Sequence, residues 1–268
     1  MHKVTAYPDG VFCWVDLATT DLTGAKAFYS QLFGWEADDS PLPGGMTYTT
    51  FRLDGFSVAG MGPLMPEQQA AGVPANWSSY VKHDDAEAIA ERITAAGGTL
   101  LMPPMDVMEE GRMLMAQDPT GAVFGVWQPG RHTGAQRVNA PNSLVWNELQ
   151  THNHNVESAV QFYNEVFGWT ERRPESGYVG LAVDGRRQAG ILPLDESRAN
   201  IPSNWAVYFL VEDVADAVRR AEALGAEIHV PETALDERSS FAVIRDPHGA
   251  YFNVVHWPDE WIDPPPGV

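Results

Sequence analysis

The sequence predicts an α+β fold in which a domain made of two βαβββ units occurs twice within 268 residues. The main observation is an internal repeat, because the stretch FYSQLFGW from Phe28 to Trp35 returns as FYNEVFGW from Phe162 to Trp169. A repeat that persists along a chain is the signature of duplicated structural units. Two shorter repeats support it: Asn76-Trp77 with Asn204-Trp205, and Asp118-Pro-Thr-Gly121 with Asp246-Pro-His-Gly249.

The first unit of each copy begins with a strand and a helix. Residues 11–17, VFCWVDL, have the aromatic and β-branched content of a strand. Asp21 suits the N-cap of a helix that runs to Phe33, and Gly34 suits the left-handed position after its end. The second copy repeats this order with Asn155 as the cap and Gly168 as the terminator.

A hairpin follows each of these helices. The runs from Tyr48 to Leu53 and from Phe56 to Met61 are separated by Asp54-Gly55, a dipeptide typical of tight hairpin turns. Asp184-Gly185 takes the same place in the second copy.

The second unit of each copy follows the same plan. A strand from Trp77 to Val81 leads to a cap near Asp85, a helix that closes at Gly97, and strands that end at 124–127. Its counterpart has a strand from Trp205 to Phe209, a cap near Asp213, a helix end at Gly225 and a last strand around 252–255.

These elements divide the chain into two domains, 1–130 and 142–258. A linker at 131–141 is expected because Gly, Pro, Asn and polar residues gather there without periodicity. The Pro-rich residues 259–268, which include Asp263-Pro-Pro-Pro-Gly267, are expected to form a loose tail.

Charge and composition exclude several classes of partner. The chain has 17 Lys and Arg against 36 Asp and Glu, and a formal net charge of −19 repels nucleic acid and anionic membranes. A single cysteine, Cys13, and the absence of a signal-like or membrane-spanning run favour a cytoplasmic protein. We expect a monomer or homodimer whose partner is a small-molecule ligand.

The FYxxLFGW-like helix ends, the Asp-Pro-x-Gly turns and the four-unit plan together resemble the vicinal oxygen chelate superfamily. This superfamily includes glyoxalase I, bleomycin resistance proteins and extradiol dioxygenases, and the resemblance looks closest for its two-domain actinobacterial members, often labelled hydroxylases. It implies two curved, cup-shaped sheets with helices outside and small-molecule binding inside each cup. It does not imply one chemistry, because a single scaffold can host many functions.

The resemblance also implies metal ligands (His, Gln or Glu) on strand positions that face into the cup. Counted back from the Phe-Tyr pair, the first-strand position falls on Trp14 in the first copy. In the second copy it falls on Trp146 if the two tryptophans align, or on Glu148 if the same number of residues separates it from the Phe-Tyr pair. The remaining positions hold Gly60, Gly190, Ser78, Ala206, Gly125 and Asn253. Only Glu148 is an ordinary ligand, and a divalent ion needs several donors. We therefore expect no metal cofactor, with a divalent ion held by Glu148 and misaligned histidines as the rival.

Each cup is instead expected to present a tryptophan beside a carboxylate. Strand alternation places Trp14 with Asp16 and Trp146 with Glu148 on one face. Desolvation on an apolar wall raises the pKa of a carboxyl group, which makes Asp16 and Glu148 candidate general acids or bases. The alternative is that each carboxylate only accepts hydrogen bonds from a neighbouring strand. Because only the second copy has Glu148, Asn253 and the longer His-bearing loop, its cup is the first to test if one cup alone is active.

Further ligand-binding candidates lie on the strand that opens the second unit. Asn76 and Tyr80 should share a face, as should Asn204 and Tyr208, and their amide and phenol groups suit a polar ligand. Alternatively, each asparagine bonds to the backbone of the turn before its strand. Asn253 on the last strand is a further candidate.

Two other groups of residues are less clearly functional. His152 and His154 are expected in a solvated loop before the Asn155 cap. The methionines are expected in a loop between late strands, where they suit either a cup rim or core filling. They are Met102, Met105, Met108, Met113 and Met115.

The sequence thus favours a metal-free protein that binds a small polar or aromatic molecule and acts by sequestration or by proton transfer. The alternatives are a metal-dependent lyase, isomerase or dioxygenase of the glyoxalase type, and a partner-binding protein with vestigial cups. Whether a cup forms within each half or between the first and last units stays open.

Overall fold

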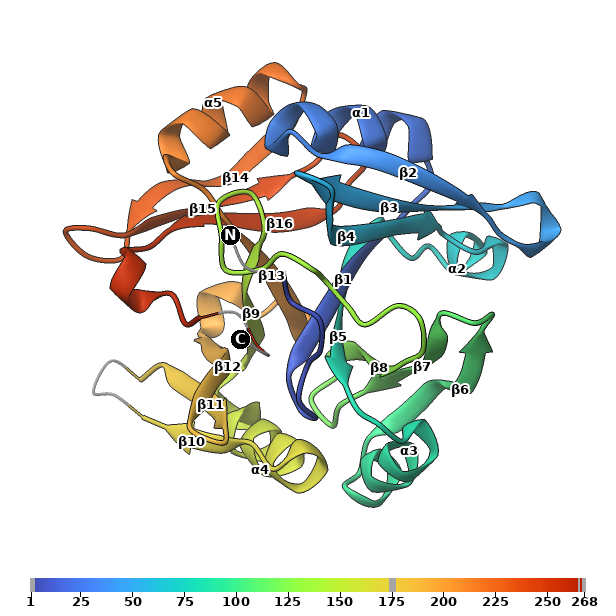
Figure 1. Ribbon diagram of the computed structural model, residues 1–268. Coiled ribbons are helices and arrows are strands. Elements are labelled where there is room, and N and C mark those ends of the chain that lie inside the picture. The colour runs from blue at the N-terminus through green and yellow to red at the C-terminus, as the bar shows by residue number, and fades with distance from the viewer. Residues whose placement is uncertain (1–2, 174–176, 265, 267–268) are drawn as a thin grey trace.

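A computed structural model describes residues 3–173, 177–264 and 266 of the chain. Its strands form two eight-stranded mixed sheets with the orders β2-β3-β4-β1-β5-β8-β7-β6 and β10-β11-β12-β9-β13-β16-β15-β14 (Figure 1). The α+β fold of two repeated domains is therefore confirmed.

The first sheet contains β1 (Phe12–Thr19), β2 (Glu36–Pro41), β3 (Thr47–Leu53), β4 (Phe56–Pro63), β5 (Asn76–Lys82), β6 (Thr99–Val107), β7 (Gly111–Gln117) and β8 (Val123–Pro129). The second contains β9 (Leu144–His152), β10 (Thr170–Arg172), β11 (Val179–Val183), β12 (Arg186–Leu194), β13 (Asn204–Leu210), β14 (Glu227–Ala234), β15 (Ser240–Arg245) and β16 (Tyr251–His256). The α-helices are α1 (Leu22–Phe33), α2 (Pro66–Ala70), α3 (Ala86–Ala95), α4 (Val156–Phe167) and α5 (Val214–Ala223). Short 3₁₀ helices are η1 (Pro43–Gly45), η2 (Asn153–Asn155), η3 (Glu196–Arg198) and η4 (Asp259–Trp261).

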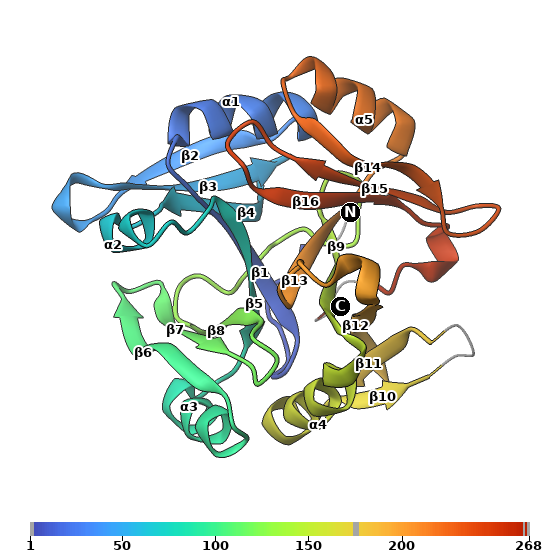
Figure 2. The same cartoon turned by 180° about the vertical axis from the view of Figure 1, so that it is seen from behind.

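Each sheet forms within one half of the chain, which answers the question that the sequence left open. Strand β1 pairs antiparallel with β5, and β9 pairs in the same way with β13, so the two units of each half join at the centre of their own sheet. The curved sheets lie back to back and open in opposite directions (Figures 1 and 2). Helices α1 and α5 lie side by side at one end, and α3 and α4 at the other.

Most of the predicted helix and turn signals are found in the structure. The Asp21 side chain caps α1 by accepting from the backbone N–H of Gly24, and Gly34 ends the helix with φ of 72°. The Asp54-Gly55 turn has positive φ at both residues, as such a hairpin turn requires. Asn155 lies at the predicted N-cap position of α4, but its backbone is helical and its side chain makes no cap bond, because η2 runs directly into α4.

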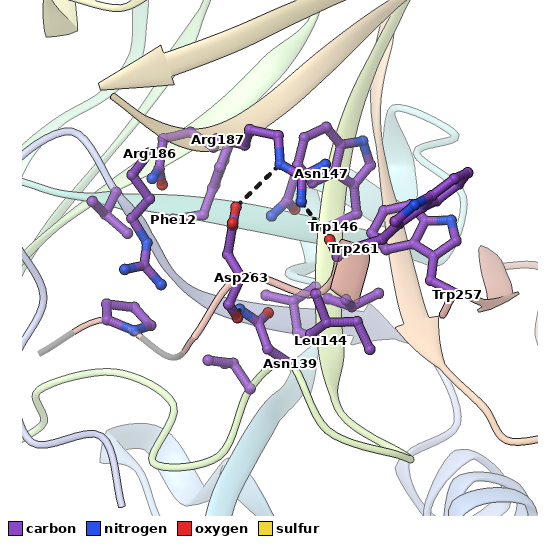
Figure 3. Close-up of a pocket in the computed structure, with 16 residues that line it drawn as sticks. Phe12, Asn139, Leu144, Trp146, Asn147, Arg186, Arg187, Trp257, Trp261 and Asp263 are labelled. Carbon is purple, nitrogen blue, oxygen red and sulfur yellow. Dashed lines mark hydrogen bonds and ion pairs between the residues drawn. The ribbon is translucent and has the colours of Figure 1, made fainter. Parts of the chain in front are cut away.

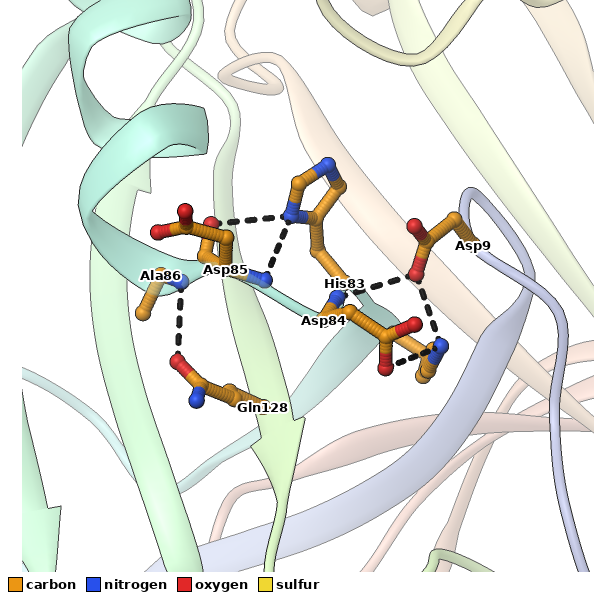
Figure 4. Close-up of polar contacts among 7 residues, drawn as sticks. Asp9, His83, Asp84, Asp85, Ala86 and Gln128 are labelled. Carbon is orange, nitrogen blue, oxygen red and sulfur yellow. Dashed lines mark hydrogen bonds and ion pairs between the residues drawn. The ribbon is translucent and has the colours of Figure 1, made fainter.

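The start of α3 shows how a strand end and a helix are joined (Figure 4). Lys82 is almost buried and its ammonium lies 2.7 Å from an Asp9 carboxylate oxygen and 2.6 Å from one of Asp84. The His83 ring lies 2.8 Å from the carbonyl oxygen of Asp85, so its contacts are local. This histidine therefore stabilises the helix start.

The apolar core joins each half to the other. On one side, α1 packs against the second sheet, with Phe33 and Phe209 ring centroids 5.2 Å apart. On the other, the α4 residues Phe162 and Phe167 pack against Phe124 of the first sheet. The backs of both sheets are therefore buried by shared packing, and their concave faces are directed away from this core.

The repeated motifs meet at this interface between the halves. The Trp77 indole N–H donates to the Tyr29 hydroxyl at 3.0 Å, and Tyr29 donates to the carboxylate of Asp246 at 2.8 Å. The second copy mirrors this chain from Trp205 through Tyr163 to Asp118, with both bonds at 2.8 Å. The Asn-Trp, Phe-Tyr and Asp-Pro motifs of the sequence are thus explained as structural contacts between halves.

The linker and the tail close corresponding ends of the two sheets. In the linker, the Ala135 N–H donates to the Cys13 carbonyl and the Gln136 N–H to the Ser57 carbonyl, both at 2.8 Å. In the tail, the Asp263 carboxylate lies 3.2 Å from Arg187. The prediction of a loose tail was therefore wrong for 259–264 and 266. The other tail residues, 265 and 267–268, lie outside the described residues.

The methionine cluster also differs from its prediction. Met102 and Met105 lie in β6, and Met113 and Met115 in β7, so these four occupy strands and not a loop. Only Met108 lies in the connecting turn, with φ of 48°.

No helix among the described residues is long and apolar enough to cross a membrane.

The buried hydrogen-bond chains predict a large stability effect from a small change. Tyr29→Phe leaves one oxygen of the Asp246 carboxylate and the Trp77 N–H without a partner, and we expect a loss of about 1–3 kcal/mol in the free energy of unfolding. Urea denaturation measures it. Tyr251→Phe is the matched control, because that side chain is 49% exposed. Equal stabilities for the two variants would contradict the interface role.

Candidate functional site

Strand register shows which predicted residues share the concave face of the first sheet. Trp14 lies opposite Tyr80, and Asp16 lies opposite Ser78 on one side and Gly60 on the other. Directly opposite residues in paired strands project to the same face. Trp14, Asp16 and Tyr80 therefore come together as the sequence suggested.

The second sheet has the same arrangement. Trp146 lies opposite Tyr208, and Glu148 lies opposite Ala206 and Gly190. The tryptophans thus align between the copies. The alternative alignment, which keeps the same distance to the Phe-Tyr pair and matches Trp14 with Glu148, is wrong. Glu148 corresponds to Asp16, and so each cup has one carboxylate at the same place.

In the first cup, two phenols hold the carboxyl group. Tyr80 donates to the two Asp16 oxygens at 3.2 and 3.3 Å. Tyr48 also bonds to Asp16, and its hydroxyl in turn accepts the Trp14 indole N–H at 3.0 Å. The side chains of β1, β3 and β5 therefore form one continuous hydrogen-bonded group.

Burial dominates the electrostatics of this carboxyl group. It raises the pKa of Asp16 from 3.8 to about 7, although the hydrogen bonds from Tyr80 and Tyr48 oppose the rise. A carboxyl group with a pKa near neutrality can both donate and accept a proton at physiological pH.

The second cup holds Glu148 in the same way. Tyr208 donates to a Glu148 oxygen at 2.7 Å, and Gln150 lies 3.4 Å from that oxygen. Tyr178 also bonds to Glu148 and accepts the Trp146 N–H at 2.9 Å. Burial raises the pKa of Glu148 as well, against the effect of these hydrogen bonds.

Tyrosine side chains fill the space that metal-ligating side chains on the neighbouring strands would need. A Cβ atom at Gly60 would overlap the Tyr48 hydroxyl, and one at Gly190 would overlap that of Tyr178. A Cβ at Gly125 would enter the Tyr80 ring. Glycine is therefore required at these positions by the tyrosine packing.

These residues do not fit the divalent metal that the fold family implies. Each cup offers a single carboxylate, already bonded to two phenols, where a metal needs several converging donors. Across 3–173, 177–264 and 266, no group of three or more His, Cys, Asp or Glu side chains is placed to hold a metal ion.

The asparagines predicted to bind ligand differ in their surroundings. The Asn76 amide donates to the Pro74 carbonyl at 2.8 Å, and Asn204 does the same to Pro202 at 2.9 Å. These contacts match the backbone role that was the alternative. Asn253 donates to the Val207 carbonyl at 3.0 Å, and its buried Oδ1 has no hydrogen-bond partner within the described part of the chain.

His132 is a further residue of the first cup that the sequence did not indicate. Its ring centroid lies 4.4 Å from that of Trp14 and 5.6 Å from that of Trp127. Burial, with a smaller effect from Arg52, lowers its pKa to about 4, so the ring is neutral at physiological pH. No repeat or motif marks a linker residue, and only the path of the linker brings His132 here.

The prediction of a solvated loop for His152 and His154 is partly wrong. His152 is the last residue of β9, and strand alternation puts it on the same face as Glu148. His154 lies in η2, and the two rings stack with centroids 5.8 Å apart. His152 is thus part of the cup edge and not of a solvated loop.

A separate hollow lies beside the second cup, where β9 and β12 meet the linker and the tail (Figure 3). Trp146 and Arg186 line it, and the ion pair between Arg187 and Asp263 crosses it. Neither Glu148 nor Asp16 lines this hollow. We place the candidate chemistry at the carboxylates, because polar groups converge there.

Comparison with known proteins agrees with the geometry. The family model for the Glyoxalase/Bleomycin resistance protein/Dioxygenase superfamily matches residues 12–126 and 152–254. The chain is 37% identical over 260 residues to the "Putative glyoxylase CFP32" of Mycobacterium tuberculosis, covering 95% of this chain and 98% of that protein. It is 36% identical over 267 residues to the "Anthracycline biosynthesis protein DnrV" of Streptomyces peucetius, covering 94% and 95%.

Solved structures share the fold. A Mn(II)-bound glyoxalase from Novosphingobium aromaticivorans has a TM-score of 0.62 at 17% identity, covering 93% of this chain and 83% of that one. The 2,3-dioxygenase LapB from Pseudomonas sp. KL28 has a TM-score of 0.62 at 15% identity, covering 96% and 97%.

The raised pKa of Asp16 predicts a pH-dependent stability. The unfolded chain ionises this group near 3.8 and the folded chain near 7, so its contribution is fully present below about 3.8 and is lost as the pH rises to about 7. Asp16→Asn should therefore gain stability relative to the unmodified protein between pH 4 and 7, with no further gain above. Urea denaturation across this range measures the difference. A parallel pH profile for both proteins would contradict the assignment, and the exposed Asp259→Asn controls for loss of a charge.

Proposed function

Since the chain belongs to the Glyoxalase/Bleomycin resistance protein/Dioxygenase superfamily, we propose that it binds a small polar or aromatic organic molecule in its cups without a bound metal. The observation that carries this proposal is the buried carboxyl group that two tyrosines hold in each cup. Relatives named for anthracycline biosynthesis support an organic metabolite as the ligand.

Proton transfer is the reaction that these residues can perform. Asp16 and Glu148 would donate a proton to a ligand carbonyl or remove one from an acidic C–H or O–H group. Tyr80 and Tyr208 would fix the carboxyl oxygens during this transfer. Where turnover does not occur, the same contacts would serve to sequester the ligand.

Aromatic walls would provide most of the binding energy. Trp14 and Trp146 adjoin the carboxyl groups, and a flat ligand can stack on such surfaces while polar groups fix its orientation. Asn76, Asn204 and Asn253 remain candidate ligand contacts through their side-chain oxygens, because each amide nitrogen donates to a backbone carbonyl.

Replacement of the carboxyl groups should separate catalysis from folding. We expect Glu148→Gln and Asp16→Asn to lower turnover of a carbonyl substrate by about 100-fold or more, the usual contribution of a general acid or base. NMR detection of hydrogen exchange next to the carbonyl in D₂O measures this, and thermal unfolding checks the fold. Unchanged exchange with both variants folded would contradict proton transfer by these carboxyl groups, whereas ligand binding without any exchange in the unmodified protein would favour sequestration. A loss of folding would assign a structural role to the carboxyl.

The rival function is a metal-dependent lyase, isomerase or dioxygenase, which the fold of the Mn(II)-bound glyoxalase suggests. Elemental analysis of protein purified without chelators distinguishes the two. We expect far less than one tightly held divalent ion per chain. About one ion per chain, lost on Glu148→Gln, would overturn the metal-free proposal.

A third function, partner binding with vestigial cups, predicts that no small molecule stabilises the fold. A ligand that binds the folded state must raise the unfolding temperature. A broad screen of carbonyl and aromatic compounds without any thermal shift would favour this third function.

A further inference from the structure

At two positions beside the carboxyl group, the second cup has an amide side chain that the first cup lacks. Strand β8 has Gly125 opposite Tyr80, whereas β16 has Asn253 opposite Tyr208. Strand β1 has Ala18 opposite Asn76, whereas β9 has Gln150 opposite Asn204. The second cup therefore carries two amides where the first carries none.

The difference between Gly125 and Asn253 goes together with a difference in the length of the acidic side chain. In the first cup the Tyr80 ring occupies the space above Gly125, so no side chain fits there. In the second cup Asn253 is buried at the equivalent place, and Tyr208 still reaches its acid, at 2.7 Å. Glu148 is one methylene longer than Asp16, which allows the tyrosine to lie farther from the last strand. The residues of the second cup therefore fit one another as well as those of the first cup do.

Asn253 retains an unused acceptor. The side chain is 3% exposed, its Nδ2 is bonded to the Val207 carbonyl, and its buried Oδ1 has no partner among the described residues. Reversing the amide does not help, because an oxygen would then face the Val207 carbonyl oxygen. A buried acceptor without a donor costs free energy, and a ligand hydroxyl or N–H would remove that cost.

The walls of the cups differ in the same direction. In the first cup, Met115 lies opposite Gly125, Met113 lies opposite Trp127, and Met102 extends this face. The second cup has Val243 opposite Asn253 and Phe241 opposite Val255. Polarizable thioethers adapt to apolar ligands of varied shape, so the first wall does not require a hydrogen-bonding ligand.

We propose that the second cup selects ligands that carry a hydroxyl or N–H donor, which Asn253 Oδ1 accepts beside Glu148. This inference rests on the proposed function, because it assumes that both cups bind small molecules. It assigns Asn253 as the specificity-determining residue of the second cup.

Matched probes test the selection. Umbelliferone has a planar aromatic ring, a carbonyl and one hydroxyl group, and its methyl ether differs only in lacking the donor. Calorimetric titration at a pH below the pKa of that hydroxyl gives the total binding. All nine methionines lie in the first half of the sequence, so methyl NMR of labelled methionine reports on the first cup alone.

In the second cup we expect umbelliferone to bind about 5-fold to 100-fold more tightly than its methyl ether, the range expected when a buried acceptor is left unpaired. The methionine signals show whether either probe also occupies the first cup. Asn253→Leu should remove the preference in the second cup and leave the methionine signals unchanged. Asn253→Gly, which copies the first cup, is the second variant if Leu does not fold.

The possible results distinguish the selection by Asn253 from the proposed binding of small molecules in the cups. Equal affinities of both probes for the second cup, binding confined to the first cup, or a preference that survives both substitutions would overturn the selection by Asn253. Absence of binding to either cup would instead count against the proposed function itself.

Discussion

The arrangement of the whole molecule depends on two buried hydrogen-bond chains that run between its halves. In each, an indole N–H donates to a tyrosine hydroxyl of one half, and that hydroxyl donates to an aspartate of the other half. The second oxygen of each aspartate accepts backbone N–H groups of its own Asp-Pro turn, as Asp246 does from Ala250 at 2.9 Å. Buried polar groups must be paired in this way, so neither half satisfies its own groups alone.

This constraint determines where a ligand can bind. Because the sheet backs and four helices are committed to the shared core, the cups face outward and apart (Figure 2). A cup residue can then change without disturbing the contacts between halves. Asp16 and Glu148 differ in length, and Gly125 and Asn253 differ in chemistry, while Tyr29 and Tyr163 keep identical roles. Duplication followed by retention of the interface leaves two sites free to diverge.

The sequence predicted the parts of the fold that depend on local chemistry. The repeats, the Asp21 cap and the Asp54-Gly55 turn each have a short-range physical cause, and all three are present. Pairing of the halves was not predictable, because strand content does not say which edges meet. A loop of different length left two alignments of Glu148 open, and strand register selects the one that makes it equivalent to Asp16. His132 required the path of an irregular linker, which no periodicity records.

If the cups hold no metal, as we propose, the pair of tyrosines beside each carboxyl group, which we call the tyrosine clamp, explains how a buried carboxyl group is accommodated. A bare carboxylate buried on an apolar wall is costly, and a metal ion would normally compensate it. Here the phenols of Tyr48 and Tyr80 provide that compensation, and Gly60 gives the space that the first phenol needs. Any larger side chain at Gly60 would displace Tyr48, and with it the partner of Asp16 and of the Trp14 N–H. The members of the clamp therefore depend on one another, and a substitution at one of them affects the whole hydrogen-bonded group.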